Sequence, residues 1–439
     1  MDASAYFRGK RITVMGLGLL GRGVGDVRYL AECGAELVVT DLKTREQLAE
    51  SIAQLETFPS ITFVLGEHRL EDFRDRDLIL KAAGVPLDSP YIAEAKAHNI
   101  PVRMSADLFM ELSGIPAVGV TGTRGKSTTT HMIAAILEAA GKKVLLGGNV
   151  RGVSTLALLP EVTPEHVAVL ELDSWQCQGL GEARVAPHIA VFTTLYPDHL
   201  NYYKGDLDAY LADKANIFRF QNQDDVLVLG LQAAELVKSK YSGDIFSGME
   251  VVSAADLPSD WVLAVPGEHN RYSGALALAA ARAYGISDDV SRGALESFAG
   301  VPGRLEFLRE VGGVKVYNDN NATTPEATLA ALAALNDGHR KSIILIMGGA
   351  DKGLDMSTLL AKISEVKKVV LLAGTGTERI KGELSEGMIY HTLSDAVSVA
   401  MSMTEPGDTL LFSPAFASFG MFKNEYDRGD QFTALVQAL

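Results

Sequence analysis

The sequence predicts an α/β protein of three domains: a Rossmann-like unit at the N-terminus, a central sheet with a phosphate-binding loop, and a second Rossmann-like α/β domain at the C-terminus. Three observations lead to this prediction. Short apolar segments alternate with helical stretches along the whole chain, which favours mostly parallel sheets. At 439 residues the chain is too long for one hydrophobic core. Glycine-rich turns follow a strand and open a helix at two places.

The first domain, residues 1–101, begins with an expected strand at 11–15 that leads into the turn GLGLLG at 16–21. Asp41 follows at the end of the next expected strand. A G-x-G-x-x-G turn with an acidic residue about 20 positions later is typical of dinucleotide binding. The same turn accepts any nucleotide diphosphate, because it offers backbone amides at a helix start. NAD or FAD, another nucleotide diphosphate and a purely structural turn therefore stay open. Further strands are expected at 36–40, 78–81 and 101–103.

The second domain, residues 102–301, contains the most informative stretch, IPAVGVTGTRGKSTTT at 115–130. An apolar strand enters a glycine-rich turn, and the turn opens a helix. Backbone N–H groups there bind phosphate, the lysine adds positive charge, and the serine hydroxyl can ligate Mg²⁺. Val120 replaces the first glycine of the strict G-x-x-x-x-G-K-[ST] pattern. We predict a P-loop ATPase sheet whose loop binds ATP through Gly122, Thr123, Gly125, Lys126, Ser127 and Thr128.

Two polar residues stand at the ends of neighbouring expected strands in this domain. Glu171 closes the strand in LELDSWQ, and His199 follows the next strand in TTLYPDHLNYY. Carboxyl ends of parallel strands share one rim with the phosphate loop, so both residues are expected on that rim, and the carboxylate of Glu171 is expected as a Mg²⁺ ligand. Asp173 and Asp198 are alternatives. Strands are expected at 144–146, 167–172, 189–193 and 226–229, and an alanine-rich helix at 273–283.

Lys214 lies in the helical stretch DAYLADKANIF, whose apolar positions are 207, 211, 215 and 218. The residues alone favour a solvent-exposed helix lysine at this position.

The third domain, residues 302–439, places small and polar residues after three expected strands. These segments are 318–323 (NDNNAT), 348–352 (GGADK) and 413–418 (SPAFAS). Open α/β sheets bind ligands at this edge, so the three segments together indicate a binding site. The expected strands are 314–317, 343–347, 369–372 and 409–412.

Composition excludes several functional classes. The net charge is −15 without a basic run, which argues against nucleic-acid binding. No apolar run approaches the roughly 18 residues of a membrane span, and the N-terminus has no signal-type apolar region. Two cysteines exclude a disulfide framework. We therefore expect a cytoplasmic protein.

Taken together, these motifs resemble the Mur ligases, the ATP-dependent amide ligases of peptidoglycan precursor synthesis. The resemblance covers nearly the whole chain in order: GLGLLG, GVTGTRGKST, GGN at 147–149, LELDSWQ, DH at 198–199, PGEHN, GVPGRLE, ND-x-x-AT, GGADKG and SPAFASF-x-x-FKN-x-x-x-RG. The resemblance implies an enzyme that adds D-glutamate to UDP-N-acetylmuramoyl-L-alanine through an acyl phosphate. The resemblance implies a monomer that uses ATP and Mg²⁺, with that sugar nucleotide and a free amino acid as partners.

The resemblance also implies roles for individual residues. Lys126, His199 and Lys214 would be catalytic, and Lys214 would be carbamylated by CO₂. Mg²⁺ ligands would be Ser127, Glu171, His199 and Lys214. Further ATP contacts would be Asn270, Arg304 and Asp319. The UDP-sugar would contact Gly18, Leu19, Leu20, Asp41 and Asn149. The amino acid would contact Asn321, Thr323, Lys352 and Ser418.

The chain departs from the family pattern at several of these sites. The usual NDSKAT is NDNNAT here, so an expected lysine is Asn321, and an expected phenylalanine is Glu425. Ligation of L-glutamate or another amino acid is therefore an alternative to D-glutamate. An NAD-dependent oxidoreductase, a P-loop regulator or kinase, a folate-type polyglutamate ligase and an inactive scaffold are further alternatives. Four further residues of this chain differ from those that the family usually has: Leu20, Ala82, Ala83 and Asp173.

Overall fold

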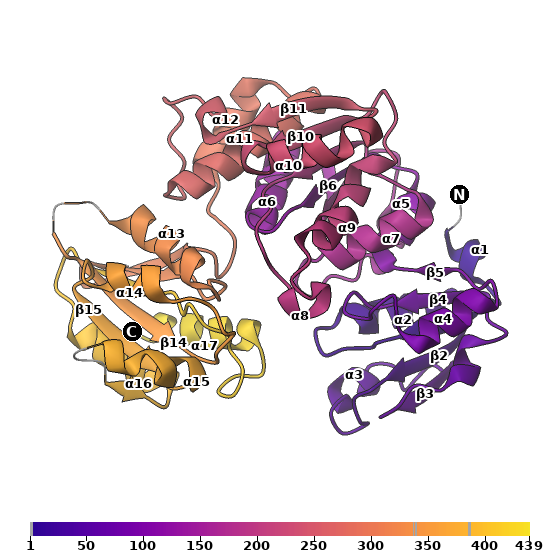
Figure 1. Ribbon diagram of the computed structural model, residues 1–439, viewed down its shortest axis with the longest axis horizontal. Coiled ribbons are helices and arrows are strands. Elements are labelled where there is room, and N and C mark those ends of the chain that lie inside the picture. Colours follow the sequence, from indigo (N-terminus) through magenta and orange to yellow (C-terminus); the bar gives the residue numbers. More distant parts are fainter. Residues whose placement is uncertain (1–2, 337, 339, 385–387) are drawn as a thin grey trace. The chain divides into compact units, whose positions relative to one another are not determined.

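The α/β architecture consists of three separate sheets of five, six and six strands (Figure 1). The computed structural model describes residues 3–336, 338, 340–384 and 388–439. Two compact units contain these sheets, the first two sheets in one unit and the third sheet in the other. Their limits are Met1–Leu257 with Ser273–Ala294, and Pro258–Tyr272 with Leu295–Leu439. The three-domain α/β class is confirmed, and the domain limits at 101 and 301 stay a prediction.

The first sheet is parallel throughout. Its strands are β1 (Arg11–Met15), β2 (Glu36–Asp41), β3 (Ile61–Leu65), β4 (Leu78–Lys81) and β5 (Val102–Arg103), in the order β3-β2-β1-β4-β5. Its helices are α1 (Ala3–Phe7), α2 (Arg22–Glu32), α3 (Ala49–Ala53), a 3-10 turn (Leu70–Phe73) and α4 (Pro90–Ala97). The strand order reverses between β1 and β4, and such a reversal opens a crevice at the carboxyl ends of the strands.

The second sheet is also parallel and holds the phosphate loop at its centre. Its strands are β6 (Ala117–Thr121), β7 (Lys143–Gly148), β8 (His166–Glu171), β9 (Ile189–Phe192), β10 (Val226–Gly230) and β11 (Gly248–Val252), in the order β11-β10-β9-β6-β8-β7. The helices of this region are α5 (Ser105–Ser113), α6 (Lys126–Ala139), α7 (Ser174–Ala183), α8 (Leu200–Tyr203), α9 (Leu207–Arg219), α10 (Leu231–Tyr241), α11 (Glu268–Ala283) and α12 (Asp288–Ser297), with 3-10 turns at Leu156–Glu161, Ser242–Asp244 and Ala254–Asp256. All residues of β6 and β9 are buried, as expected for strands covered on both faces.

The third sheet is mixed, because β12 pairs with β13 in the antiparallel sense. Its strands are β12 (Glu306–Val311), β13 (Val314–Asn318), β14 (Ile343–Gly348), β15 (Lys368–Leu372), β16 (Ile389–Tyr390) and β17 (Thr409–Phe412), in the order β12-β13-β17-β14-β15-β16. Its helices are α13 (Pro325–Leu335), α14 (Ser357–Ile363), α15 (Thr375–Ile380), a 3-10 turn (Lys381–Glu383), α16 (Leu393–Ser402) and α17 (Glu425–Gln437). Because β13, β17 and β14 are neighbours, the three predicted strand-end segments do share one edge.

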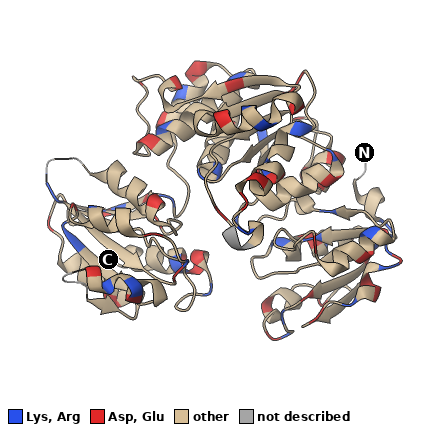
Figure 2. Cartoon of the chain, in the orientation of Figure 1, with Lys and Arg blue, Asp and Glu red and all other residues tan. Residues whose placement is uncertain are grey.

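The sequence prediction missed four strands, β3, β11, β12 and β16, and all four lie at sheet edges. Helix α11 begins at Glu268, five residues before the predicted start, because its first turn is polar and follows Pro266-Gly267. Figure 2 shows Asp and Glu positions interspersed with Lys and Arg positions along the ribbons of all three sheets and their helices. Among the described residues, no helix is both long and apolar enough to cross a membrane.

Candidate functional site

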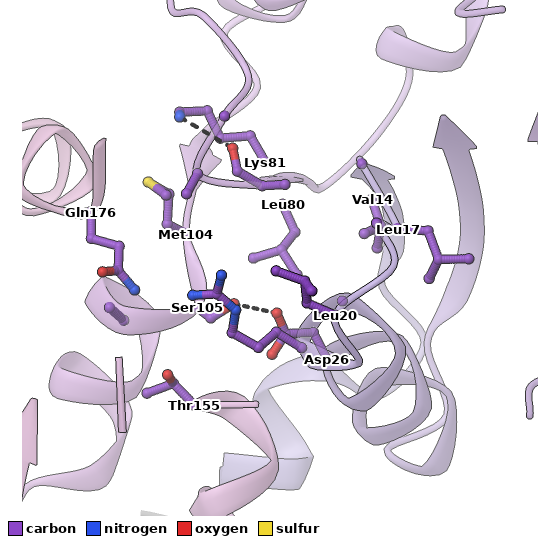
Figure 3. Close-up of a pocket in the computed structure, with 18 of the residues that line it drawn as sticks. Val14, Leu17, Leu20, Asp26, Leu80, Lys81, Met104, Ser105, Thr155 and Gln176 are labelled. Carbon is purple, nitrogen blue, oxygen red and sulfur yellow. Dashed lines mark hydrogen bonds between the residues drawn. The ribbon is translucent and has the colours of Figure 1, made fainter. Parts of the chain in front are cut away.

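A cavity of about 230 Å³ lies at the carboxyl ends of β1 and β4, where the order of the first sheet reverses (Figure 3). One wall is formed by the turn after β1, including Gly18, Leu19 and Leu20, the residues predicted to contact a UDP-sugar. The opposite wall comes from the second sheet's region, where Ser105, Thr155 and Gln176 face the cavity in Figure 3. The cavity therefore lies between two sheets of the same compact unit.

Asp41 is buried beneath this turn and binds the turn itself. Its Oδ2 accepts hydrogen bonds from the N–H groups of Leu17 and Gly18 at 3.0 and 3.1 Å, and its Oδ1 accepts one from Lys43 N at 2.9 Å. The carboxylate thus fixes the conformation of the glycine-rich turn. Asp41 is not one of the residues that line the cavity, and its predicted contact with the nucleotide stays a prediction.

A second buried carboxylate, Asp26 on α2, connects the first sheet's helix to the second sheet's region. Ser154 Oγ donates to its Oδ1 at 2.6 Å, and Ser105 Oγ donates to its Oδ2 (Figure 3). Burial raises the pKa of Asp26 above its usual range, although both serine hydrogen bonds oppose the shift. Helix α2 also passes close to Ser154, since a Cβ on Gly25 would lie 2.5 Å from Ser154 Cβ.

The phosphate loop connects β6 to α6 and is held by the end of β9. Thr123 N donates to Thr194 O at 2.7 Å, and Arg124 N donates to Thr194 Oγ1 at 2.9 Å. Gly122 has a φ of +138°, and a Cβ there would lie 2.0 Å from Thr193 Oγ1, so only glycine fits. Gly125 precedes α6 without a side-chain cap, which leaves the first amides of the helix oriented toward an anion.

Lys126 and Ser127 form the first turn of α6. Lys126 Nζ donates to Gly122 O at 3.0 Å and to Thr123 O at 3.2 Å, so its ammonium lies over the loop. Ser127 is buried, and Thr128 is half-buried on the same helix. The six residues predicted to bind phosphates are therefore brought together in one loop and helix start.

Glu171 ends β8, which is a neighbour of β6 in the sheet and pairs Glu171 with Val120. Its side chain is buried, and within the described part of the chain no lysine, arginine or histidine lies within ion-pair distance of its carboxylate. Asn149 Nδ2 lies 3.5 Å from its Oε1. A buried carboxylate is costly unless a cation or hydrogen bonds compensate its charge, so this position fits a bound cation.

His199 follows β9 with a φ of +52°, in the left-handed region. Its ring centroid lies 4.6 Å from that of Trp175. Burial lowers the pKa of His199, and a neutral imidazole is the form that ligates metals. The neighbouring Asp198 forms an ion pair with Arg124 at 2.9 Å. Although burial raises the pKa of Asp198, the charges of Arg124 and His199 lower it overall.

The predicted Mg²⁺ ligands thus include one carboxylate, one hydroxyl and one imidazole from separate elements. In residues 3–336, 338, 340–384 and 388–439 no three His, Cys, Asp or Glu side chains cluster to hold a metal. Mg²⁺ binds through one or two carboxylates plus substrate phosphates and waters. The residues present therefore fit a Mg²⁺ that shares its ligands with a nucleotide.

The expectation from the residues alone that Lys214 is solvent-exposed is wrong. Its side chain is 1% exposed on α9, and its Nζ donates to Gly122 O at 2.9 Å and to Thr121 Oγ1 at 3.3 Å. Burial, together with the charge of Lys126, lowers the pKa of Lys214 to about 7. Position 214 lies three residues after Leu211 and four before Phe218, on the apolar face of the helix. This spacing places Lys214 among the apolar positions of the helix, and it could have predicted that the side chain is buried.

Asp173, considered as an alternative metal ligand, is the N-cap of α7. Its Oδ1 accepts a hydrogen bond from Gln176 N at 2.8 Å, while Gln176 Oε1 accepts one from Asp173 N at 3.0 Å. This reciprocal pair is a capping box. The carboxylate therefore has a structural partner, and Gln176 is placed in the cavity wall.

In the second compact unit, Asp319 lies under the strand ends of β13 and β17. Its Oδ1 accepts a hydrogen bond from Leu305 N at 3.0 Å, and its Oδ2 accepts one from Ser413 Oγ at 2.8 Å. Burial raises the pKa of Asp319 to about 7, although Ser413, Leu305 and Arg304 oppose the shift. Arg304 is exposed beside it. Asn270, on α11, donates from Nδ2 to Pro266 O at 2.7 Å.

The residues predicted to bind the amino acid lie along the edge formed by β13, β17 and β14. Lys352 Nζ donates to Thr323 Oγ1 at 2.9 Å, so these two are brought together. Asn321 instead donates from Nδ2 to Pro302 O at 3.3 Å. Ser418 is buried after β17.

The resemblance includes the RG at 428–429, but sequence reasoning gave no role to Arg428, a fully buried arginine on α17. Its Nε and Nη2 donate to Asn320 Oδ1 and O at 2.6 and 2.9 Å, and its Nη1 donates to Phe416 O at 3.1 Å. Burial lowers the pKa of Arg428 to about 10. These hydrogen bonds join the segments after β13 and β17. The sequence around Arg428 has no periodic apolar pattern from which its burial could have been predicted.

Comparison with known families gives three consecutive matches. The models match Mur ligase MurD-like, N-terminal domain at residues 10–104; Mur ligase middle domain at 120–254; and Mur ligase, glutamate ligase domain at 303–416.

Curated relatives match over nearly the full length. A protein of Roseiflexus sp. (strain RS-1) named UDP-N-acetylmuramoylalanine--D-glutamate ligase is 37% identical over 98% of this chain and 99% of its own. One of the same name from Streptococcus thermophilus is 34% identical over 100% of both chains.

Among solved structures, UDP-N-acetylmuramate-alanine ligase MurC from Thermotoga maritima has a TM-score of 0.62 at 20% identity, covering 98% of this chain and 99% of its own. MurF ligase from Thermotoga maritima in complex with ADP has a TM-score of 0.62 at 16% identity, covering 100% of both chains. These two structures share the fold.

Proposed function

The chain belongs to the Mur ligase family, and from this membership we propose that it joins D-glutamate to UDP-N-acetylmuramoyl-L-alanine at the expense of ATP. The full-length relatives that carry this activity in their names support the assignment. It is an acid–amino-acid ligase of peptidoglycan synthesis. ATP and a nucleotide-linked sugar are both cytoplasmic substrates, so the reaction belongs in the cytoplasm.

Each substrate has a candidate location. The cavity beside Gly18–Leu20 would take the sugar nucleotide, because it lies at the switch point of a parallel sheet and at a helix start. The phosphate loop would take ATP through Lys126 and the first amides of α6. The edge of the third sheet would take D-glutamate, with Lys352 and Thr323 binding one of its carboxylates.

The chemistry follows from the poor electrophilicity of a carboxylate. A carboxylate oxygen of the sugar nucleotide attacks the γ-phosphorus of ATP and expels ADP, which yields an acyl phosphate. The amine of D-glutamate then attacks the carbonyl carbon, loses a proton and expels inorganic phosphate. Lys126 would stabilise the charge that develops on the transferring phosphoryl group. Bound Mg²⁺ would supply further charge stabilisation, held by Ser127, Glu171 and His199.

Lys214 would act as a carbamate. Its amine is buried beside Gly122, and its lowered pKa of about 7 leaves a large neutral fraction that can attack CO₂. The C–N bond forms and a proton is released, so a cation becomes an anion next to Lys126. The carbamate oxygens would then bind Mg²⁺ and stabilise the Lys126 ammonium.

The single observation that carries the assignment is the full-length match to D-glutamate ligases. The test is a phosphate-release assay with ATP, Mg²⁺, UDP-N-acetylmuramoyl-L-alanine and a panel of amino acids. We expect release with D-glutamate. Release only with L-glutamate, or only with a neutral or basic amino acid, would refute D-glutamate as the substrate. These other amino acids belong in the panel because Asn321 stands where the family usually has a lysine.

A further inference from the structure

Arg22 is the first residue of α2 and lies directly after the glycine-rich turn, where its side chain helps to line the cavity beside Leu19 and Leu20. The two leucines offer no polar side-chain atoms. The amides of Leu17 and Gly18 already donate to Asp41. Any side-chain contact from this turn and helix start to an anion must therefore come from Arg22.

The guanidinium of Arg22 is held by Asn149, and its charge opposes the rise in the pKa of Asp26, four residues further along α2. One of its N–H groups donates to Asn149 Oδ1. In the part of the chain that the structure describes, no aspartate or glutamate lies within ion-pair distance of it. The nearest acidic residue of the cavity wall, Asp26, accepts its hydrogen bonds from Ser105 and Ser154. A guanidinium has several more donors and binds diphosphate oxygens in a bidentate way.

The other cation of the cavity wall is already engaged. Lys81 is buried, and its Nζ donates to Val85 O at 3.1 Å and to Ala82 O at 3.5 Å. Its ammonium therefore stabilises the turn after β4. Arg22 alone combines a charged group, a position at the helix start and remaining donors.

We propose that Arg22 is a specificity-determining residue that binds the diphosphate of the sugar nucleotide. The proposal rests on the proposed function, which supplies a substrate with a diphosphate. Asn149 holds the guanidinium toward the cavity by accepting its N–H. The same hydrogen bond orients the Asn149 amide so that Nδ2 faces Glu171 Oε1, 3.5 Å away. Arg22 thus connects the diphosphate position to the residue expected to hold the metal.

The experiment measures binding by calorimetry with the full-length protein. The ligands are UDP, uridine, UDP-N-acetylmuramoyl-L-alanine and a non-hydrolysable ATP analogue. The variants are Arg22→Gln and Arg22→Lys. The matched control is Arg28→Gln on the same helix, whose guanidinium lies 3.5 Å from Gln54 O, outside the cavity wall. Binding of the ATP analogue reports that each variant is folded.

We expect Arg22→Gln to weaken UDP and the sugar nucleotide by about 10- to 100-fold and to leave uridine and the ATP analogue unchanged. Arg22→Lys should lie between Arg22→Gln and wild type, and Arg28→Gln should equal wild type. UDP affinity within about two-fold of wild type in Arg22→Gln would overturn the proposal.

Two other results would overturn it as well. An equal loss for uridine would assign Arg22 a structural role, and a loss confined to the sugar nucleotide would assign it to the alanyl carboxylate. Wild-type protein that binds UDP but forms no amide would refute the proposed function alone. Wild-type protein that binds neither UDP nor the sugar nucleotide would refute both.

Discussion

At the scale of single residues, Lys352 is the cation of the proposed amino-acid site, where the family's usual lysine is Asn321. Its Nζ donates to Thr323 Oγ1 at 2.9 Å, while the amide of Asn321 donates to Pro302 O. We therefore expect Lys352 to supply the cationic contact to the amino acid at this edge of the sheet. Asn321 carries no charge, and its hydrogen bond to Pro302 O stabilises the segment that leads into β12.

We predict that Lys352→Ala raises the KM for D-glutamate by about 10- to 100-fold, the range expected for loss of a charge-assisted hydrogen bond. The KM values for ATP and the sugar nucleotide should change little, because Lys352 is not among the residues predicted to contact either of these substrates. Steady-state kinetics measure all three. Lys362→Ala, an exposed lysine on α14 paired with Glu365, is the matched control. An unchanged KM for D-glutamate would remove Lys352 from the site.

Lys81 gives a prediction about pH. Burial lowers its pKa to about 8 in the folded protein, although several acidic groups, Asp173 first, oppose the shift. The unfolded chain has a pKa near 10.5, so between about pH 8 and 10.5 the unfolded state binds more protons than the folded state. Raising the pH through this window therefore stabilises the folded protein at Lys81, by on the order of 3 kcal/mol in total.

Melting temperatures of wild type and Lys81→Met across pH 8–10.5 measure this effect. Wild type should gain stability relative to Lys81→Met as the pH rises. The exposed Lys142→Met should run parallel to wild type. If the melting temperatures of wild type and Lys81→Met change in parallel with pH, the conclusion that burial lowers the pKa of Lys81 is wrong.

Individual residues show what sequence could and could not predict about the site. The phosphate-loop residues follow from a local pattern and lie in one loop, as expected. The burial of Lys214 was encoded in its position on the apolar face of α9, whereas the general rarity of buried lysine argued against it. The binding of Asp41 to the turn after β1 and the proposed role of Arg22 depend on which groups meet between different elements, and local patterns contain no such information.

At the scale of elements, Asp173 is the N-cap of α7. The capping box with Gln176 satisfies amides at the helix start and holds Gln176 in the cavity wall. The family pattern has serine at this position, and serine is also a good N-cap. The departure noted in the sequence therefore preserves the local structure.

We predict that Asp173→Ala lowers stability by about 1 kcal/mol, whereas Asp173→Ser stays within a few tenths of wild type. Urea unfolding followed by far-UV circular dichroism measures the difference. Equal destabilisation by both substitutions would show that charge rather than capping determines the contribution of Asp173.

Central strands could be predicted from sequence and several edge strands could not. Strands such as β6 and β9 are continuous apolar runs, because helices cover both faces of the sheet. In the missed strands β3 and β11 most residues are partly or fully exposed, and β16 has only two residues. Exposed edge strands lack the continuous apolar pattern on which the prediction relied.

At the scale of the whole molecule, the chemistry distributes the substrates over two compact units. The phosphate loop and the candidate sugar-nucleotide cavity belong to the first unit, whereas the predicted D-glutamate contacts and the predicted ATP contacts Asn270, Arg304 and Asp319 belong to the second. Amide formation requires the amine to reach the acyl phosphate before water does.

The central claim is that ATP activates the sugar carboxylate as an acyl phosphate, which the amine of D-glutamate then attacks. The most direct measurement follows ¹⁸O from the alanyl carboxylate of UDP-N-acetylmuramoyl-L-alanine by mass spectrometry of the released phosphate. We predict that phosphate formed in the presence of D-glutamate carries one ¹⁸O atom from the carboxylate for each amide formed. Phosphate without label, at any yield of amide or ADP, would contradict the account.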